Sequence, residues 1–303
     1  MRPPFFIVGT QRSGTTLLYQ MLNSHPELYL VNEFWDLYPH LTGEVRDPAA
    51  LERLLVAHLG LTTSHLGGTG APDEPFTLVD RAFEKRLEEL GKSRWGIKHP
   101  RLTYYLDLFA AHYPEARFVV IVRDARGVNR SYLTRKMNVA NVYHGARLWR
   151  EQVGIQSEFM RRHPDVCHRL RFENLLAAPE SRLRDICDFL GEQYSDHMLR
   201  YYRYSPDTSV HAGNVNITRP IQPGVADKWR TELSSRQIGI IEAIAGDTMV
   251  EHGYELTGAV ARLGPRQRRI YDLHQWLLTT YWWQRRSGWS GLRKRWARWF
   301  RGR

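Results

Sequence analysis

Short apolar runs alternate with segments of helical periodicity along most of the chain. Apolar runs predict buried strands at residues 5–8, 28–31 and 117–123, the last being the strongest. A weaker strand is predicted at 95–98, before Pro100, and a further strand around 166–172. Helices are predicted over 15–22, before His25-Pro26, and over 102–112 and 183–190, where apolar residues recur three and four positions apart. Strands that alternate with helices are typical of an α/β fold with a parallel sheet.

Several sequence features bear on the compartment. No apolar run approaches the ~18 residues needed to cross a bilayer, and the run 5–8 is too short for a signal peptide. The two cysteines, Cys167 and Cys187, offer neither a disulfide framework nor a CxxC metal pair. These features predict a cytoplasmic protein. The glycine- and proline-rich stretches 67–75 and 205–224 are predicted to be long loops.

The formal charge of +11 comes from one end of the chain. Residues 262–303 hold twelve basic residues and one acidic residue, whereas residues 1–261 hold 31 of each. Six of the ten tryptophans lie in the same C-terminal segment. We therefore expect a body over 1–260 and a basic, tryptophan-rich helical tail over 261–303.

The tail contains two amphipathic stretches. In the second, 285–303, tryptophans follow helical spacing and basic residues fill the other positions, a pattern typical of interfacial membrane binders. We expect this stretch to contact an anionic membrane surface. The first stretch, 270–282, is expected to pack on the body or on a second subunit. Nucleic acid is not an expected partner, because no nucleic-acid-binding module accompanies the tail.

A glycine-rich loop joins the first predicted strand to the first predicted helix. Residues 9–16, Gly-Thr-Gln-Arg-Ser-Gly-Thr-Thr, have the spacing of a Walker A loop, whose main-chain N–H groups bind phosphate. Thr15 occupies the position of the Walker lysine, and the cation of the loop is Arg12. The loop therefore predicts a bound nucleotide rather than metal-assisted ATP hydrolysis. On its own, the motif also fits an ordinary glycine-rich turn.

A second group of polar residues follows the strongest predicted strand. Arg123 and Arg126 come directly after it, and Ser131 and Arg135 share one face of the next predicted helix. Ligands of open α/β sheets bind at the carboxyl ends of the strands, so this group suits a second phosphate. The alternative is that Arg123, Asp124 and Arg126 form ordinary surface ion pairs.

Together these motifs resemble the PAPS-dependent sulfotransferases, over about residues 5–230. The loop 9–16 resembles their 5′-phosphosulfate loop, 123–131 resembles their 3′-phosphate motif, and 171–176 is similar to a segment further along those enzymes. Within the family, the pattern is most similar to that of the tyrosylprotein sulfotransferases. That likeness rests on residues 12–16, His25-Pro26, Glu33, Lys98 and Arg135-Lys136.

The resemblance implies a P-loop-type parallel sheet flanked by helices, with PAPS as co-substrate and PAP as product. It makes Glu33 the general base and brings Arg12 and Lys98 into contact with the transferring sulfuryl group. It also implies two sets of donor-binding residues: Arg12, Ser13, Gly14, Thr15 and Thr16 on the 5′ side, and Arg123, Ser131 and Arg135 at the 3′-phosphate.

The chain also departs from the tyrosylprotein enzymes, which are luminal, membrane-anchored and disulfide-bonded. Leu30 and Gly96 stand where their paired cysteines are expected, and Phe34-Trp35 replaces an arginine that reads acidic peptides. Phe172 replaces a tyrosine, and a downstream serine and lysine have only Asn216, Thr218 and Lys228 as candidate counterparts. These departures argue against peptidyl tyrosine as the acceptor and leave the transfer chemistry intact.

Sulfuryl transfer, like phosphoryl transfer, requires positioning, charge stabilisation and removal of the acceptor's proton. Arg12 and Lys98 can supply the charge and Glu33 can take the proton, with His99 as the reserve candidate for the base. No metal is expected, since the thirteen histidines show no metal-binding spacing. The acceptor stays open among the hydroxyls of carbohydrate, lipid, phenol and peptide.

We therefore expect a cytoplasmic, membrane-peripheral sulfotransferase that moves a sulfuryl group from PAPS to a hydroxyl by in-line transfer. One alternative is a P-loop kinase or NTPase acting on a small molecule, which the missing lysine disfavours. The other is a non-catalytic nucleotide-binding scaffold, which the joint presence of Arg12, Glu33 and Lys98 disfavours. The oligomeric state is left open.

Overall fold

The computed structural model describes residues 2–63, 66, 74–135, 139–204, 217, 219–222 and 224–280. The chain forms two compact units, one from 1–122 with 155–223 and the other from 123–154 with 224–303. The first unit contains the sheet, and the described part of the second is helical. The expected boundary at residue 260 stays a prediction, and the stretch 285–303 lies outside the described residues.

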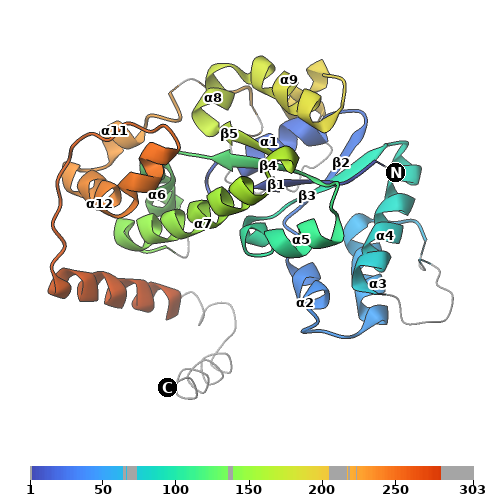
Figure 1. Cartoon of the computed structure of the whole chain (residues 1–303), viewed down its shortest axis with the longest axis horizontal. Coiled ribbons are helices and arrows are strands. Elements are labelled where there is room, and N and C mark those ends of the chain that lie inside the picture. The colour runs from blue at the N-terminus through green and yellow to red at the C-terminus, as the bar shows by residue number, and fades with distance from the viewer. Residues whose placement is uncertain are drawn as a thin grey trace. The chain divides into compact units, whose positions relative to one another are not determined.

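Five parallel strands form the sheet, in the order β2-β3-β1-β4-β5 (Figure 1). The expected α/β fold with a parallel sheet is confirmed, and each strand lies within a residue or two of its predicted position. All of β1 and most of β4 are buried, which explains their continuous apolar runs. The strands are β1 (Phe5–Val8), β2 (Leu28–Asn32), β3 (Arg94–Lys98), β4 (Arg117–Val122) and β5 (Cys167–Arg171).

Helices cover both faces of the sheet. In Figure 1, α1, α8 and α9 lie on one side and α4 and α5 on the other. On the α4 and α5 side, an aromatic core joins strands to helices: Trp95 stacks on Phe83 with ring centroids 4.0 Å apart, and Phe6 meets Phe109 edge-on at 4.9 Å. The helices of this unit are α1 (Thr15–Asn23), α2 (Tyr38–Leu41), α3 (Pro48–Leu59), α4 (Pro75–Leu90), α5 (Leu106–His112), α8 (Phe172–Ala177), α9 (Pro179–Leu190) and α10 (Tyr201–Tyr204).

The helix predicted over 102–112 is interrupted. Pro100–Tyr104 form a 3₁₀ turn and α5 begins at Leu106, because Tyr105 between them has φ −126° and ψ 14°, outside the helical region. Leu102, Leu106 and Phe109 are all buried nevertheless, so the apolar stripe that predicted one long helix spans the break.

The second unit contains α6 (Ala125–Arg135), α11 (Trp229–Glu232), α12 (Ser235–Glu251), a helix over 265–280 and the first part of α7 (Val142–Arg162). A capping box starts α12, in which Ser234 and Gln237 satisfy each other's main-chain N–H groups. Throughout the described ranges, no helix combines the length and apolarity needed to span a membrane.

Candidate active site

The glycine-rich loop lies between β1 and α1 and ends in a helix N-terminus. The Ser13 N–H donates to the Thr10 carbonyl at 3.1 Å, and the two hydroxyls hydrogen-bond to each other. Gly14 takes the left-handed conformation, with φ 91°, and α1 begins at the next residue. The first N–H groups of a helix have no carbonyl partners within it, and Gly14 has no side chain to cap them. The loop therefore suits an anion.

Two glycines fit the loop closely into the body. A Cβ on Gly9 would lie 2.6 Å from the Ile121 carbonyl oxygen, and a Cβ on Gly14 would overlap the Phe172 ring. Larger residues at either position would push the loop away from β4 and α8. Phe172 belongs to the 171–176 segment noted in the sequence, so this segment supports the loop.

Glu33 and Lys98 meet where β2 and β3 end. Asn32 pairs with Lys98 in the sheet, and the Glu33 N–H donates to the Lys98 carbonyl at 2.8 Å. The side chains meet as well, since Lys98 Nζ donates to Glu33 Oε1 at 2.8 Å. The register of two neighbouring strands thus joins residues that are 65 positions apart.

Lys98 also reaches the start of α1. Its side chain is only 1% exposed, and Nζ lies 3.4 Å from Thr16 Oγ1. The lysine therefore stands between the Glu33 carboxylate and the end of the glycine-rich loop. This places one cation within reach of both an acidic side chain and the glycine-rich loop.

The pKa of Glu33 reflects this arrangement. Burial raises the pKa of the carboxyl, but the charge and hydrogen bond of Lys98, together with His99 and Trp35, lower the pKa below its ordinary value. Glu33 is therefore ionised at neutral pH. An ionised carboxylate that is not fully buried can accept a proton from a hydroxyl.

Backbone strain is found at two of the predicted catalytic residues. Among the residues that the structure describes, the non-glycine positions with left-handed φ are Arg12, at 70°, and Glu33, at 55°. This conformation costs an L-residue about 1–2 kcal/mol. Such strain concentrates at functional sites, so its occurrence at Arg12 and Glu33 supports the roles that the sequence suggests.

His99 is poorly suited to act as a base. Its Nδ1 accepts the Arg101 N–H at 3.0 Å, so the proton of the neutral ring lies on Nε2. The side chain is 1% exposed, and burial lowers the pKa of the ring to about 3, against the raising effect of Glu33. The imidazole packs against Trp35 and Tyr38, with centroids 4.4 and 4.6 Å away.

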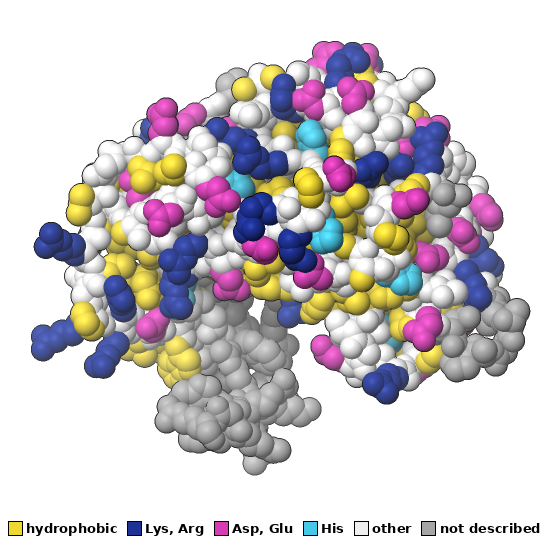
Figure 2. Space-filling model, viewed as in Figure 1, with side chains coloured by type: hydrophobic (Ala, Val, Ile, Leu, Met, Phe, Trp, Pro, Cys, Tyr) yellow, Lys and Arg dark blue, Asp and Glu magenta, His cyan; other side chains and the backbone are white. Residues whose placement is uncertain are grey.

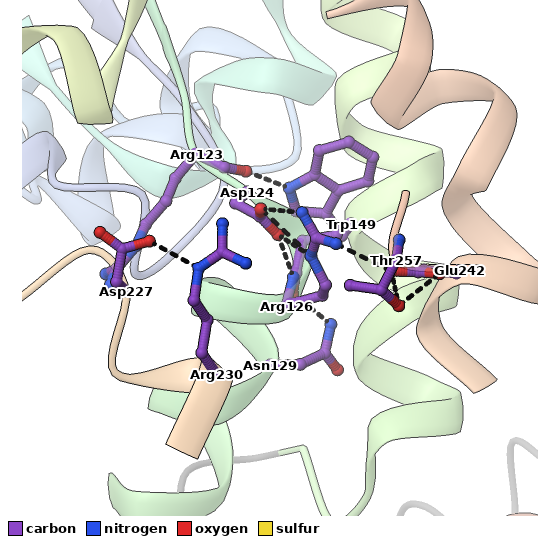
Figure 3. A network of polar contacts seen from close by, with 10 residues as sticks. Arg123, Asp124, Arg126, Asn129, Trp149, Asp227, Arg230, Glu242 and Thr257 are labelled. Carbon is purple, nitrogen blue, oxygen red and sulfur yellow. Dashed lines mark hydrogen bonds and ion pairs between the residues drawn. The ribbon is translucent and has the colours of Figure 1, made fainter. Parts of the chain in front are cut away.

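In the second unit, Arg123 is held by its neighbours (Figure 3). The Trp149 Nε1–H donates to the Arg123 carbonyl at 2.9 Å, and the guanidinium donates to the Val225 carbonyl at 3.4 Å. A Cβ on Gly127 would come within 2.9 Å of Arg123 Nε, so the guanidinium runs closely along α6. These contacts fix the position of Arg123.

Arg126 is the centre of a buried ionic network rather than a surface ion pair. It donates to Asp124 through Nε and Nη2, at 2.9 and 2.6 Å, and to Glu242 of α12 at 2.8 Å. All three side chains are almost fully buried. Thr257 completes the shell of Glu242 with hydrogen bonds from its N–H and hydroxyl (Figure 3). The alternative of surface pairing is therefore wrong, and Arg126 ties α6 to α12.

Comparison with known proteins identifies the family. Residues 3–196 match the profile of the sulfotransferase family. The chain belongs to this family. The sulfotransferase is 25% identical to protein-tyrosine sulfotransferase 2 of Gallus gallus, over 86% of its own length and 69% of that chain. It is 24% identical to nodulation protein NoeE of Sinorhizobium fredii, over 95% of its own length and 75% of that protein. The expected class, a sulfotransferase, is confirmed.

Solved sulfotransferase structures share the fold. The sulfotransferase domain from the curacin biosynthetic pathway aligns with 84% of the chain and 99% of its own, with a TM-score of 0.61 and 20% identity. The sulfotransferase domain from the olefin synthase of Synechococcus PCC 7002 aligns with 81% of the chain and 96% of its own, with a TM-score of 0.56 and 24% identity.

The remaining predicted residues of the sulfotransferase fall in different places. Ser131 is almost fully buried on α6. Arg135 lies on the same helix, but its side chain is outside the described part of the structure. Asn216 and Thr218 also lie outside the described residues. Lys228 is exposed and directly precedes α11. Sequence reasoning missed Trp149 and Glu242, which support the Arg123 region. Their sequence signal is weak, because each lies on a helix far along the chain from its partner.

Proposed function

We propose that this sulfotransferase transfers the sulfuryl group of PAPS to an acceptor hydroxyl, with Glu33 as the general base. The observation that carries the proposal is the position of Lys98, with Nζ 2.8 Å from Glu33 Oε1 and 3.4 Å from Thr16 Oγ1. The Lys98 cation therefore contacts both the proposed proton acceptor, Glu33, and the loop that we assign to the donor. That is the arrangement that in-line transfer between oxygens requires.

The donor would be bound by residues of both predicted motifs. We assign Ser13, Gly14, Thr15 and Thr16 to the 5′-phosphosulfate, because the loop is shaped for an anion. Arg123, Ser131 and Arg135 are assigned to the 3′-phosphate. The contacts that hold Arg123 support this assignment, because a fixed guanidinium loses little freedom on binding phosphate.

In the reaction, PAPS supplies the sulfuryl group and leaves as PAP. As the acceptor oxygen bonds to sulfur and the bond from sulfur to the phosphate oxygen breaks, Glu33 takes the hydroxyl proton. Arg12 and Lys98 balance the negative charge that develops on the transferring group and on the leaving oxygen. Kinase chemistry is disfavoured because Thr15 replaces the lysine that would hold β- and γ-phosphates.

Trp35 is proposed to contact the acceptor. Its neighbour Phe34 is buried and stacks on His58 with centroids 3.7 Å apart, so it belongs to the core. Trp35, two residues from Glu33, is 42% exposed. An indole offers a flat apolar surface to the sugar or phenol ring that carries a hydroxyl. Trp35→Ala should raise the KM of such an acceptor far more than it lowers kcat.

The decisive experiment is a screen of acceptor classes with labelled PAPS, run beside calorimetry with PAP and ATP. We expect PAP to bind more tightly than ATP and at least one hydroxyl acceptor to become labelled. Tighter binding of ATP, with hydrolysis, would favour the kinase alternative. Binding of PAP without transfer to any acceptor class would favour the scaffold. The cytoplasmic location and the membrane contact of 285–303 stay predictions.

A further inference from the structure

The helix over 265–280 exposes an apolar stripe along one face. Ile270, Leu273 and Leu277 are 65%, 55% and 52% exposed, and their spacing of three and four residues places them on one face. Trp276 borders the stripe and is 48% exposed. Large apolar side chains gathered in this way mark a contact surface, whereas single exposed ones need no explanation.

The opposite face of the same helix is packed. Tyr271 stacks on Tyr143 at a centroid distance of 5.6 Å, and Asp272 lies 2.9 Å from the His144 ring nitrogen. Gln275 accepts the Ala140 N–H at 2.8 Å. These contacts fix the helix against the start of α7 and orient the stripe outward. The helix therefore packs through the face that carries Tyr271, Asp272 and Gln275, whereas the sequence predicts this contact for the apolar residues of 270–282.

Basic side chains accompany the stripe. Arg266 lies on the same face, one turn before Ile270, and Arg269 borders it; both are exposed. Asp272, the acidic residue of the helix, is turned toward His144. Figure 2 shows hydrophobic and basic side chains side by side over this helix. The exposed surface is thus apolar at its centre and positive at its margin.

A surface with an apolar centre and a basic margin fits one kind of binding partner. A second copy of the chain would bring together two segments that each hold twelve basic residues and one acidic residue over 262–303, which like-charge repulsion opposes. Nucleic acid would satisfy the arginines but not a stripe of isoleucine and leucine. The interface of an anionic bilayer satisfies both.

We propose that the helix over 265–280 binds the surface of anionic phospholipid membranes, with Ile270, Leu273 and Leu277 entering the boundary between headgroups and acyl chains. This contact is separate from that predicted for 285–303 and independent of the proposed sulfuryl transfer. It would hold the second unit against the lipid through a helix that the body already orients.

The test measures binding of the full chain to vesicles of phosphatidylcholine with phosphatidylserine, and of phosphatidylcholine alone. Leu273→Gln combined with Leu277→Gln should lower the partition coefficient at least about tenfold, because two apolar side chains lose their burial. Arg266→Gln combined with Arg269→Gln should weaken binding to the anionic vesicles alone. The matched control is Leu90→Gln, which alters an equally apolar residue, 39% exposed on α4, and should bind like the unaltered protein.

Three outcomes would overturn the proposal. The leucine double variant could bind as tightly as the unaltered protein, which would leave 285–303 as the sole membrane contact. The same variant could convert a dimer to a monomer in light scattering, which would make the stripe a subunit interface. Equal affinity for both vesicle types would exclude the role of charge. Near-ultraviolet circular dichroism of each variant tests folding, and PAP calorimetry tests the donor site separately.

Discussion

Glu33 and Lys98 form an ion pair in which the Glu33 carboxylate is partly exposed and the Lys98 side chain is buried. The carboxylate side chain is 30% exposed and the lysine 1%, at a separation of 2.8 Å. The lysine is therefore held by its surroundings, and the carboxylate is the partner with access to a ligand. Lys98 lowers the pKa of Glu33 and, through Thr16, also contacts the loop that we assign to the donor.

Glu33→Gln should leave PAP affinity unchanged and lower turnover by ~10²–10⁴-fold, the usual contribution of a general base. The amide keeps the shape of the side chain and loses its ability to accept the proton. Steady-state kinetics and PAP calorimetry check the two parts. Asp36→Asn, three residues away and exposed, is the control and should retain turnover. A loss of less than about tenfold in Glu33→Gln would place the base elsewhere.

Lys98→Gln should move the acidic limb of the pH–rate profile to higher pH. Burial raises the pKa of Glu33, and Lys98 is the strongest of the groups that lower it, so the pKa rises when the lysine is removed. Activity needs the ionised carboxylate, which is lost as the pH falls through that raised pKa. The measurement is kcat/KM against pH for both proteins. An acidic limb that stays in place would contradict the coupling of Lys98 to Glu33.

Arg123→Ala should weaken PAP binding at least about tenfold, since a charge-assisted hydrogen bond contributes roughly 1.5–3 kcal/mol. ADP, which lacks the 3′-phosphate, should bind both proteins alike. Calorimetry with the two ligands measures this difference. Arg130→Ala is the matched control, because Arg130 lies on the same helix and pairs with Glu232 on the exposed surface. If PAP affinity is unchanged in Arg123→Ala, the 3′-phosphate lies elsewhere.

His99 should make the fold sensitive to acid. Burial lowers the pKa of its ring to about 3, so the folded protein binds this proton less readily than the unfolded chain, whose histidine pKa is about 6.5. The contribution is complete above pH ~6.5 and is lost as the pH falls toward 3; the loss is about 2 kcal/mol at pH ~5. Denaturant titrations of the unaltered protein and His99→Gln should diverge between these pH values. Parallel pH profiles would show that His99 titrates normally.

The strands and the glycine-rich loop could be predicted because their signals are local. The strands β1 and β4 appear in the sequence as continuous apolar runs, and the loop is marked by its glycine spacing. The helix α3 is not among those predicted, although its start also has a local signal, because Asp47 directly precedes Pro48, as is usual at a helix N-terminus. In the structure, the Asp47 side chain accepts the Ala50 N–H.

Other features depend on tertiary structure. The Glu33–Lys98 contact requires the register of β2 against β3, and the Arg126–Glu242 pair joins residues 116 positions apart. The left-handed φ values of Arg12 and Glu33 carry no sequence signal, because glycine or asparagine would be the usual residue in that conformation. Strain and long-range pairing thus mark the part of the candidate site that only a structure can supply.

The packing of Gly9 against Ile121 and of Gly14 against Phe172 also affects the thermodynamics of binding. Interior contacts set the shape of the loop, so binding of the donor that we assign to it would order little of the main chain. A preorganised loop loses less conformational entropy on binding than a flexible one. If the loop binds the donor as we propose, part of the donor affinity comes from the packing of these glycines, and larger residues there would weaken binding without removing any group that touches phosphate.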